Sequence, residues 1–107
     1  DKLQIKQIEK ISKDFPELKI IILCLYWHEV IKLSEKCKNL YFDISFIECL
    51  DTLGALLKYI SEDRVIFGSN VPFLYPESSI LKLQYSTITK EQFDKISFKN
   101  LSSFLAK

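Results

Sequence analysis

The chain has 107 residues, 48% of them hydrophobic, which is enough for one packed domain that we expect to span residues 1–107. Fifteen basic and fourteen acidic residues alternate along it and leave a net charge of +1, so no basic stripe is present and nucleic-acid binding is not expected. The longest apolar run, residues 20–27, is too short for a membrane span, so no membrane association is expected.

The first predicted elements are a helix, a strand and a second helix. Apolar side chains recur at mainly three-residue spacing over Lys2–Asp14, which predicts an amphipathic helix that ends before Pro16. Leu18–Leu25 is a nearly continuous aliphatic run, typical of a strand buried on both faces of a parallel sheet. Helical spacing returns over Trp27–Cys37.

The same alternation continues through the middle of the chain. Leu40–Ile44 is predicted as the second strand, Leu50–Ile60 as a helix and Arg64–Gly68 as a short third strand. A loop over Ser69–Pro76 then leads to a helix over Ser79–Gln84. The order predicts an α/β fold with a parallel three-stranded sheet and flanking helices.

A helix start is predicted near the C-terminus. Thr89 and Gln92 fit a capping box, in which each side chain bonds the backbone N–H of the other residue. Apolar residues continue a helical region to Leu105, with a break expected near Ser97.

Two architectures fit this element order, and periodicity alone leaves both open. One is a small open sandwich, although three strands make a thin sheet with two exposed edges. The other is an arc of a (β/α)8 barrel, which needs about 250 residues when complete. The sequence contains no methionine, which favours a processed chain or a piece of a longer one.

A family resemblance favours the barrel. The segment Arg64–Pro72, RVIFGSNVP, resembles the last barrel strand of amidohydrolase-related proteins, where an arginine, an aliphatic pair and Phe-Gly-Ser-Asp followed by proline recur. Asn39–Ser45 is similar to the preceding strand, Pro16–Ile22 to the one before it, and Thr89–Leu105 to the closing helices. The resemblance implies the last βα units of a barrel, metal-assisted hydrolysis of an amide, ester or related bond, and zinc or another divalent metal in the family.

The chain departs from the family at the metal site. Asn70 stands where the family has an aspartate, and an amide cannot serve as the anionic ligand or general base. The strand before Leu25 lacks a terminal histidine, and the only histidine, His28, follows in the run Tyr26–Glu29. The chain therefore resembles a subgroup with a degenerate metal site, and we expect it to hold no metal or cofactor by itself.

The residues that follow the strands are the candidate site, because the carboxyl ends of parallel strands share one edge where ligands bind. A polar pocket there would be lined by His28, Glu29, Asp43, Ser45, Ser69 and Asn70. The aromatic residues Tyr26, Trp27, Phe73 and Tyr75 flank the same edge, where packing is their more common use.

Each candidate also has a structural interpretation. Asn70 can bond its own turn, and His28 and Glu29 can form the first turn of a helix whose dipole favours an acid. Asp43 and Ser45 can be buried polar groups that bond backbone. A metal held by His28 and Cys24 lacks a visible third ligand.

Three function hypotheses follow. The leading one is the C-terminal part of an amidohydrolase-like barrel, inactive alone or completed by a missing N-terminal half. The second is an interaction module that completes its sheet as a homo-oligomer or on a partner chain. The third is a small α/β domain that binds a ligand at its strand ends. The three cysteines, odd in number and widely spaced, are typical of reduced, mostly buried thiols in a cytoplasmic protein.

Overall fold

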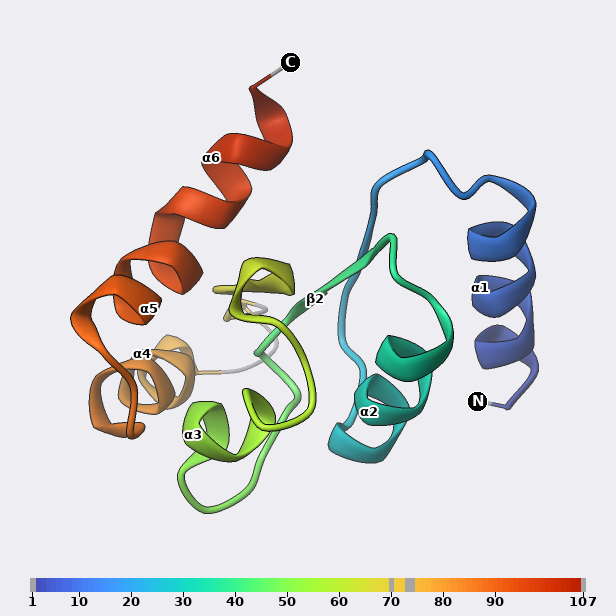
Figure 1. The fold of residues 1–107 in the computed structure, drawn as a ribbon. Helices are drawn as coiled ribbons and strands as arrows, with labels where there is room; N and C mark the ends of the chain where they lie inside the picture. The colour runs from blue at the N-terminus through green and yellow to red at the C-terminus, as the bar shows by residue number, and fades with distance from the viewer. Residues whose placement is uncertain (1, 70, 73–74, 107) are drawn as a thin grey trace.

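The computed structural model describes residues 2–69, 71–72 and 75–106, apart from the side chains of residues 2–4. It is an α/β fold in which helices flank a three-stranded parallel sheet, as the sequence predicts (Figure 1). The elements of the first two thirds are α1 (Lys2–Asp14), β1 (Ile20–Ile22), α2 (Trp27–Lys36), β2 (Leu40–Asp43), α3 (Thr52–Leu56), the 3-10 helix η1 (Glu62–Arg64) and β3 (Val65–Ile66). The C-terminal part is helical: α4 (Pro76–Tyr85), α5 (Lys90–Asp94), the π-helix η2 (Lys95–Lys99) and α6 (Asn100–Leu105).

The strands lie in chain order, β1-β2-β3, and each pair is parallel. Ile21 pairs with Tyr41, and Asp43 pairs with Ile66. Alternate residues of a strand point to opposite faces, so Phe42 lies on one face while Tyr41 and Asp43 lie on the other. The three carboxyl ends therefore meet at one edge, as the site hypothesis requires.

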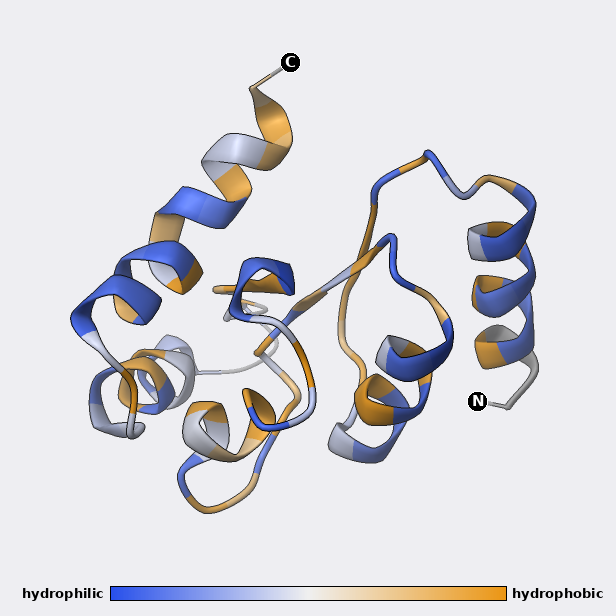
Figure 2. Ribbon diagram, viewed as in Figure 1, coloured by the Kyte–Doolittle hydropathy of each residue, from blue (hydrophilic) through white to orange (hydrophobic). Residues whose placement is uncertain are grey.

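The hydrophobic core forms where α2 and α3 pack on the sheet. Its fully buried members come from β2 and the segment after it, from β3 and from both helices: Leu40, Phe42, Ile44, Ile47, Val65, Val30, Leu33, Leu53 and Leu56. Helix α1 adds Ile5 and Ile8, which pack against this core from outside α2. Figure 2 shows the apolar residues of α1 on the side toward α2 and the polar ones on its outer side.

The first strand is shorter and more exposed than the sequence predicts. Leu18–Leu25 was expected to form a strand buried on both faces, but only Ile20–Ile22 is a strand and its side chains are half-buried. The reason is its place at the edge of the sheet, with one neighbouring strand instead of two. Leu23, just beyond the strand, has 63% of its surface exposed, and Cys24 turns the chain away with a positive φ of 63°.

Other predicted bounds also change. A helix was expected over Leu50–Ile60, but only Thr52–Leu56 (α3) is helical, and the residues that follow form turns. The strand expected over Arg64–Gly68 is reduced to Val65–Ile66, because the backbone of Arg64 ends the 3-10 helix η1.

Helix α4 begins earlier and ends one residue later than the predicted Ser79–Gln84, whereas the last helical region has its predicted start after Thr89 and its predicted end at Leu105. Helix α4 begins at Pro76, which suits a first helical position because its missing N–H would have no partner there. The capping box at α5 is confirmed: Thr89 Oγ1 accepts the Gln92 backbone N–H (3.1 Å), and Gln92 Oε1 accepts that of Thr89 (2.9 Å). The expected break near Ser97 is wrong, because the chain stays helical there and only widens into the π-helix η2.

The C-terminal helices close the outer edge of β3. The backbone N–H of Phe67 donates to the carbonyl oxygen of Ile96 (2.9 Å). The side-chain amide of Asn100 donates to the carbonyl oxygens of Val65 (2.7 Å) and Glu62 (2.6 Å). These bonds use the backbone groups through which β3 would pair with a further strand.

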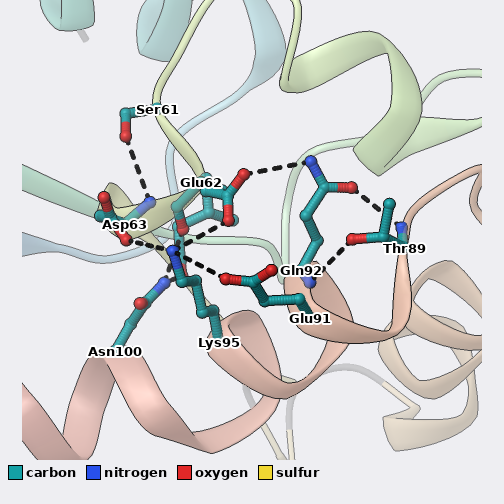
Figure 3. Close-up of polar contacts among 9 residues, drawn as sticks. Ser61, Glu62, Asp63, Thr89, Glu91, Gln92, Lys95 and Asn100 are labelled. Carbon is teal, nitrogen blue, oxygen red and sulfur yellow. Dashed lines mark hydrogen bonds and ion pairs between the residues drawn. The ribbon is translucent and has the colours of Figure 1, made fainter.

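Ion pairs reinforce this contact (Figure 3). The Nζ atom of Lys95 lies 3.0 Å from Glu62 Oε2 and 3.1 Å from Asp63 Oδ1. Gln92 Nε2 donates to Glu62 Oε1 (3.2 Å). The hydrogen bonds from Lys95 and Gln92 lower the pKa of Glu62, and the bond to Glu62 raises the pKa of Lys95. The segment before β3 is thus joined to η2 by ion pairs, to α5 by the Gln92 hydrogen bond and to α6 by the Asn100 hydrogen bond.

Two expectations from composition concern the whole chain. All three cysteines are free, but only Cys37 is buried, whereas Cys24 is half-buried and Cys49 is exposed, so the expectation of mostly buried thiols is wrong. Within the described ranges, no helix has the length and apolar character needed to cross a membrane.

Candidate functional site

A buried carboxylate joins the three strand ends. Asp43, the last residue of β2, has 5% of its surface exposed. Its Oδ1 accepts the backbone N–H of Cys24, which follows β1 (3.0 Å), and its Oδ2 accepts the hydroxyl of Ser45 (2.7 Å). Gly68, which follows β3, lies so close that an added Cβ would be 2.5 Å from Asp43 Oδ2. One side chain therefore contacts the segments that follow all three strands.

The local backbone explains how Cys24 reaches this carboxylate. A left-handed conformation is uncommon for a residue other than glycine and costs about 1–2 kcal/mol. Cys24 adopts it directly after the strand, and the turn directs its N–H toward Asp43. The hydrogen bond to a buried carboxylate offsets much of that cost.

The structure thus brings together Asp43 and Ser45, two of the predicted site residues, as buried groups that bond each other and backbone. Each carboxylate oxygen of Asp43 accepts one hydrogen bond within the fold. In the described part of the chain, no group of three or more His, Cys, Asp or Glu side chains could hold a metal ion.

His28 and Glu29 belong to the first turn of α2 and have different surroundings. Glu29 Oε1 accepts the backbone N–H of Tyr26 (3.0 Å), so its carboxylate caps the helix. His28 is exposed and contributes to the wall of the pocket described below. Glu29 therefore has the structural role of a helix cap, whereas His28 lines the pocket.

The candidates after β3 are only partly described. Ser69 is half-buried at the start of the loop, and Tyr75 is largely exposed at its end. Asn70 and Phe73 lie outside the described residues, so their predicted places at this edge are neither confirmed nor contradicted.

An open pocket of about 360 Å³ lies at the strand-end edge of the sheet. It is lined by Tyr26, Trp27, His28, Phe46 and Glu48. The first three follow β1 and the other two follow β2, so the loops after two adjacent strands form it. The Tyr26 and Phe46 rings have their centroids 5.6 Å apart with planes inclined by 35°. The Trp27 ring meets Tyr59 edge-on at 6.0 Å.

The sequence places residues 45–48 at this edge, but Phe46 and Glu48 were not singled out as pocket residues. They follow the second strand as Tyr26 and Trp27 follow the first, so their position in the loop after a strand was an available signal. An aromatic and a charged residue at these two positions are just as typical of residues that only pack, so their residue types did not mark them as pocket residues.

Lys82 is a further polar residue that the sequence did not reveal. Its Nζ atom, on α4, donates to the carbonyl oxygens of Ile44 (2.9 Å) and Ser45 (3.0 Å) just after β2. Burial lowers the pKa of Lys82, while the charges of Glu48 and Asp43 act in the opposite direction. The side chain anchors α4 to the strand-end edge, and no local pattern in the sequence predicts that contact.

Comparison with known proteins gives no family for this chain. No protein-family model matches the sequence, and no curated protein matches it. The function is therefore inferred from the geometry of the strand ends and of the two sheet edges, with the amidohydrolase resemblance as an expectation from the residues.

Proposed function

We propose that this chain forms the last three βα units of an amidohydrolase-like barrel and does not catalyse hydrolysis by itself. The observation that carries the proposal is the order β1-β2-β3 with every pair parallel, because consecutive strands of a (β/α)8 barrel are parallel neighbours. In the closed barrel the first strand would take the outer edge of β3, so the bonds from Ile96 and Asn100 to that edge would have to be replaced there. The connecting helices α2 and α3 bury their apolar side chains in one core cluster with Phe42, in keeping with helices that cover the outside of a barrel.

The strand-end edge supports the second half of the proposal. In a barrel this edge carries the active site. Here its buried carboxylate, Asp43, is bonded to Cys24 and Ser45, and Asn70 stands in the sequence at the family's last metal-binding position. Without an anionic ligand at that position, the metal-bound water of the family's reaction has no partner to position it.

Metal analysis and the coding sequence test the two halves of this proposal. We expect the purified 107-residue chain to contain substoichiometric zinc by plasma mass spectrometry after incubation with zinc and dialysis. One zinc per chain that is lost in His28→Asn, but kept in the exposed-site control Cys49→Ser, would contradict the degenerate site. An in-frame upstream continuation with an early His-x-His strand is expected for the barrel, and an in-frame stop codon there would rule it out.

A second candidate function, an interaction module, is favoured by the difference between the two sheet edges. The outer edge of β3 is closed by Ile96 and Asn100. Ile20 donates its N–H to Asn39 on the β2 side, so the N–H and C=O of Ile21 point to the outer edge of β1. Exposed apolar side chains flank this edge, Leu18 before the strand and Leu23 after it. A strand from a second copy or a partner chain would complete the sheet there.

A proline in β1 tests whether the chain self-associates through this edge. Ile21→Pro removes an N–H that points outward and breaks no hydrogen bond between β1 and β2, so the fold should tolerate it, while strand addition is blocked. We expect the wild type to sediment as a dimer at micromolar concentration, and Ile21→Pro as a monomer with an unchanged circular dichroism spectrum. Ile21→Val is the matched control and should remain dimeric. A compact wild-type monomer at these concentrations would contradict self-association.

A further inference from the structure

Aromatic side chains form much of the wall of the strand-end pocket. The aromatic side chains of Tyr26, Trp27 and Phe46 line it, and the rings of Tyr26 and Phe46 pack against each other with their planes inclined by 35°. More than half of the surface of Tyr26 is exposed, so its ring faces solvent instead of the core. Aromatic faces attract cations through the ring quadrupole, most strongly for tryptophan, and several such faces around one site are the usual receptor for alkylammonium groups.

The charges around the pocket favour the same class of ligand. Glu48 is exposed and contributes the carboxylate of the lining. Among the described residues that line the pocket, none is lysine or arginine. The N-terminus of α2, which would otherwise attract an anion, is already occupied by the carboxylate of Glu29. Lys82 directs its ammonium group to the carbonyl oxygens of Ile44 and Ser45, and its charge also interacts with that of Glu48.

From this arrangement we infer that the pocket lined by Tyr26, Trp27, Phe46 and Glu48 binds a small organic cation of the alkylammonium class. Its volume of about 360 Å³ is at the small end of the range for ligand sites and suits a compact head group. The aromatic side chains along the pocket contact the cation from one side, and Glu48 supplies the opposite charge. All the lining residues belong to loops of this chain or to the first turn of α2, so the site does not depend on a barrel or on a second copy.

The single tryptophan gives a direct readout, because Trp27 lines the pocket. Tetramethylammonium chloride is titrated at constant ionic strength against sodium chloride, and Trp27 fluorescence is followed. We expect a saturable change with a dissociation constant on the order of 1 mM, since a few cation–π contacts supply about 4 kcal/mol at most. 2,2-Dimethylpropanol, which has a similar shape without charge, should bind at least about fivefold more weakly.

Substitutions distinguish charge from shape. Glu48→Gln should weaken tetramethylammonium binding about fivefold, the effect of one nearby charge in water. Phe46→Leu should also weaken it, because one aromatic face is lost. Glu35→Gln, at an exposed position of α2, is the matched control and should bind like the wild type. Equal binding of the alcohol and the cation, unchanged affinity in Glu48→Gln, or the absence of a saturable signal in the folded wild type would each overturn the inference.

Discussion

Gly68→Ala is expected to lower the free energy of unfolding by about 1–3 kcal/mol, the usual cost of forcing extra atoms into a packed site. A Cβ at position 68 would lie 2.5 Å from Asp43 Oδ2 and 3.0 Å from Asp43 Cβ. The carboxylate cannot move aside freely, because Cys24 and Ser45 hold both of its oxygens. Urea unfolding followed by circular dichroism measures the loss.

A double-mutant cycle tests whether Asp43 is the cause. In the Asp43→Ala background the methyl group that Gly68→Ala introduces has space, so the additional cost of this second substitution should fall to less than half. Asp43→Ala alone is expected to cost about 2–3 kcal/mol, because the Cys24 N–H loses a charged acceptor in a buried place. Equal costs of Gly68→Ala in both backgrounds would show that the carboxylate does not set the limit at this position.

Arg64→Ala is expected to destabilise the fold by about 2–4 kcal/mol, because one guanidinium group satisfies three carbonyl oxygens. Its Nε donates to Leu40 (2.9 Å), Nη1 to Ser34 (3.3 Å) and Nη2 to Cys37 (2.5 Å). These carbonyls belong to the last turns of α2 and to the start of β2, so the side chain joins η1 to the α2–β2 connection. Burial lowers the pKa of Arg64, and the guanidinium carbon lies 5.8 Å from the centre of the Phe42 ring.

Lysine at the same position separates charge from geometry. Arg64→Lys keeps the positive charge, but a single ammonium group cannot reach three separated carbonyls with the same fork. We expect it to recover less than half of the stability that Arg64→Ala loses. Lys58→Ala, at an exposed position, controls for loss of a positive charge and should change stability by less than about 0.5 kcal/mol. If Arg64→Lys were as stable as the wild type, the effect of Arg64 would be due to its charge alone.

The sequence predicts the fold class because burial leaves a clear pattern in the central strand. Leu40 and Phe42 are fully buried, and the predicted strand there differs from β2 by one residue. The pattern fails at β1, where an aliphatic run as long as Leu18–Leu25 yields three strand residues. Hydrophobicity alone does not tell an edge strand from a central one, and the left-handed turn at Cys24 has no glycine or asparagine to mark it.

The site is predictable to the extent that it depends on topology. Asp43 and Ser45 were expected at the strand-end edge because parallel strands end together, and the structure brings them together there. The contacts of Arg64 and Lys82 could not be predicted, since each joins residues 24 or more positions apart through backbone carbonyls, which carry no sequence signature. The arginine that opens the resemblance to amidohydrolases therefore has a structural use that the motif itself does not disclose.

The closure of β3 by Ile96 and Asn100 also limits how copies of this chain can grow into larger assemblies. A fibril that grows by strand addition needs two exposed sheet edges on every subunit, one for each neighbouring subunit. Here only the β1 side is available among the described strands. When two copies pair through β1, neither has an open sheet edge left, so association stops at a dimer. Because Asn100 occupies the outer edge of β3, no further strand can add there and the chains do not polymerise.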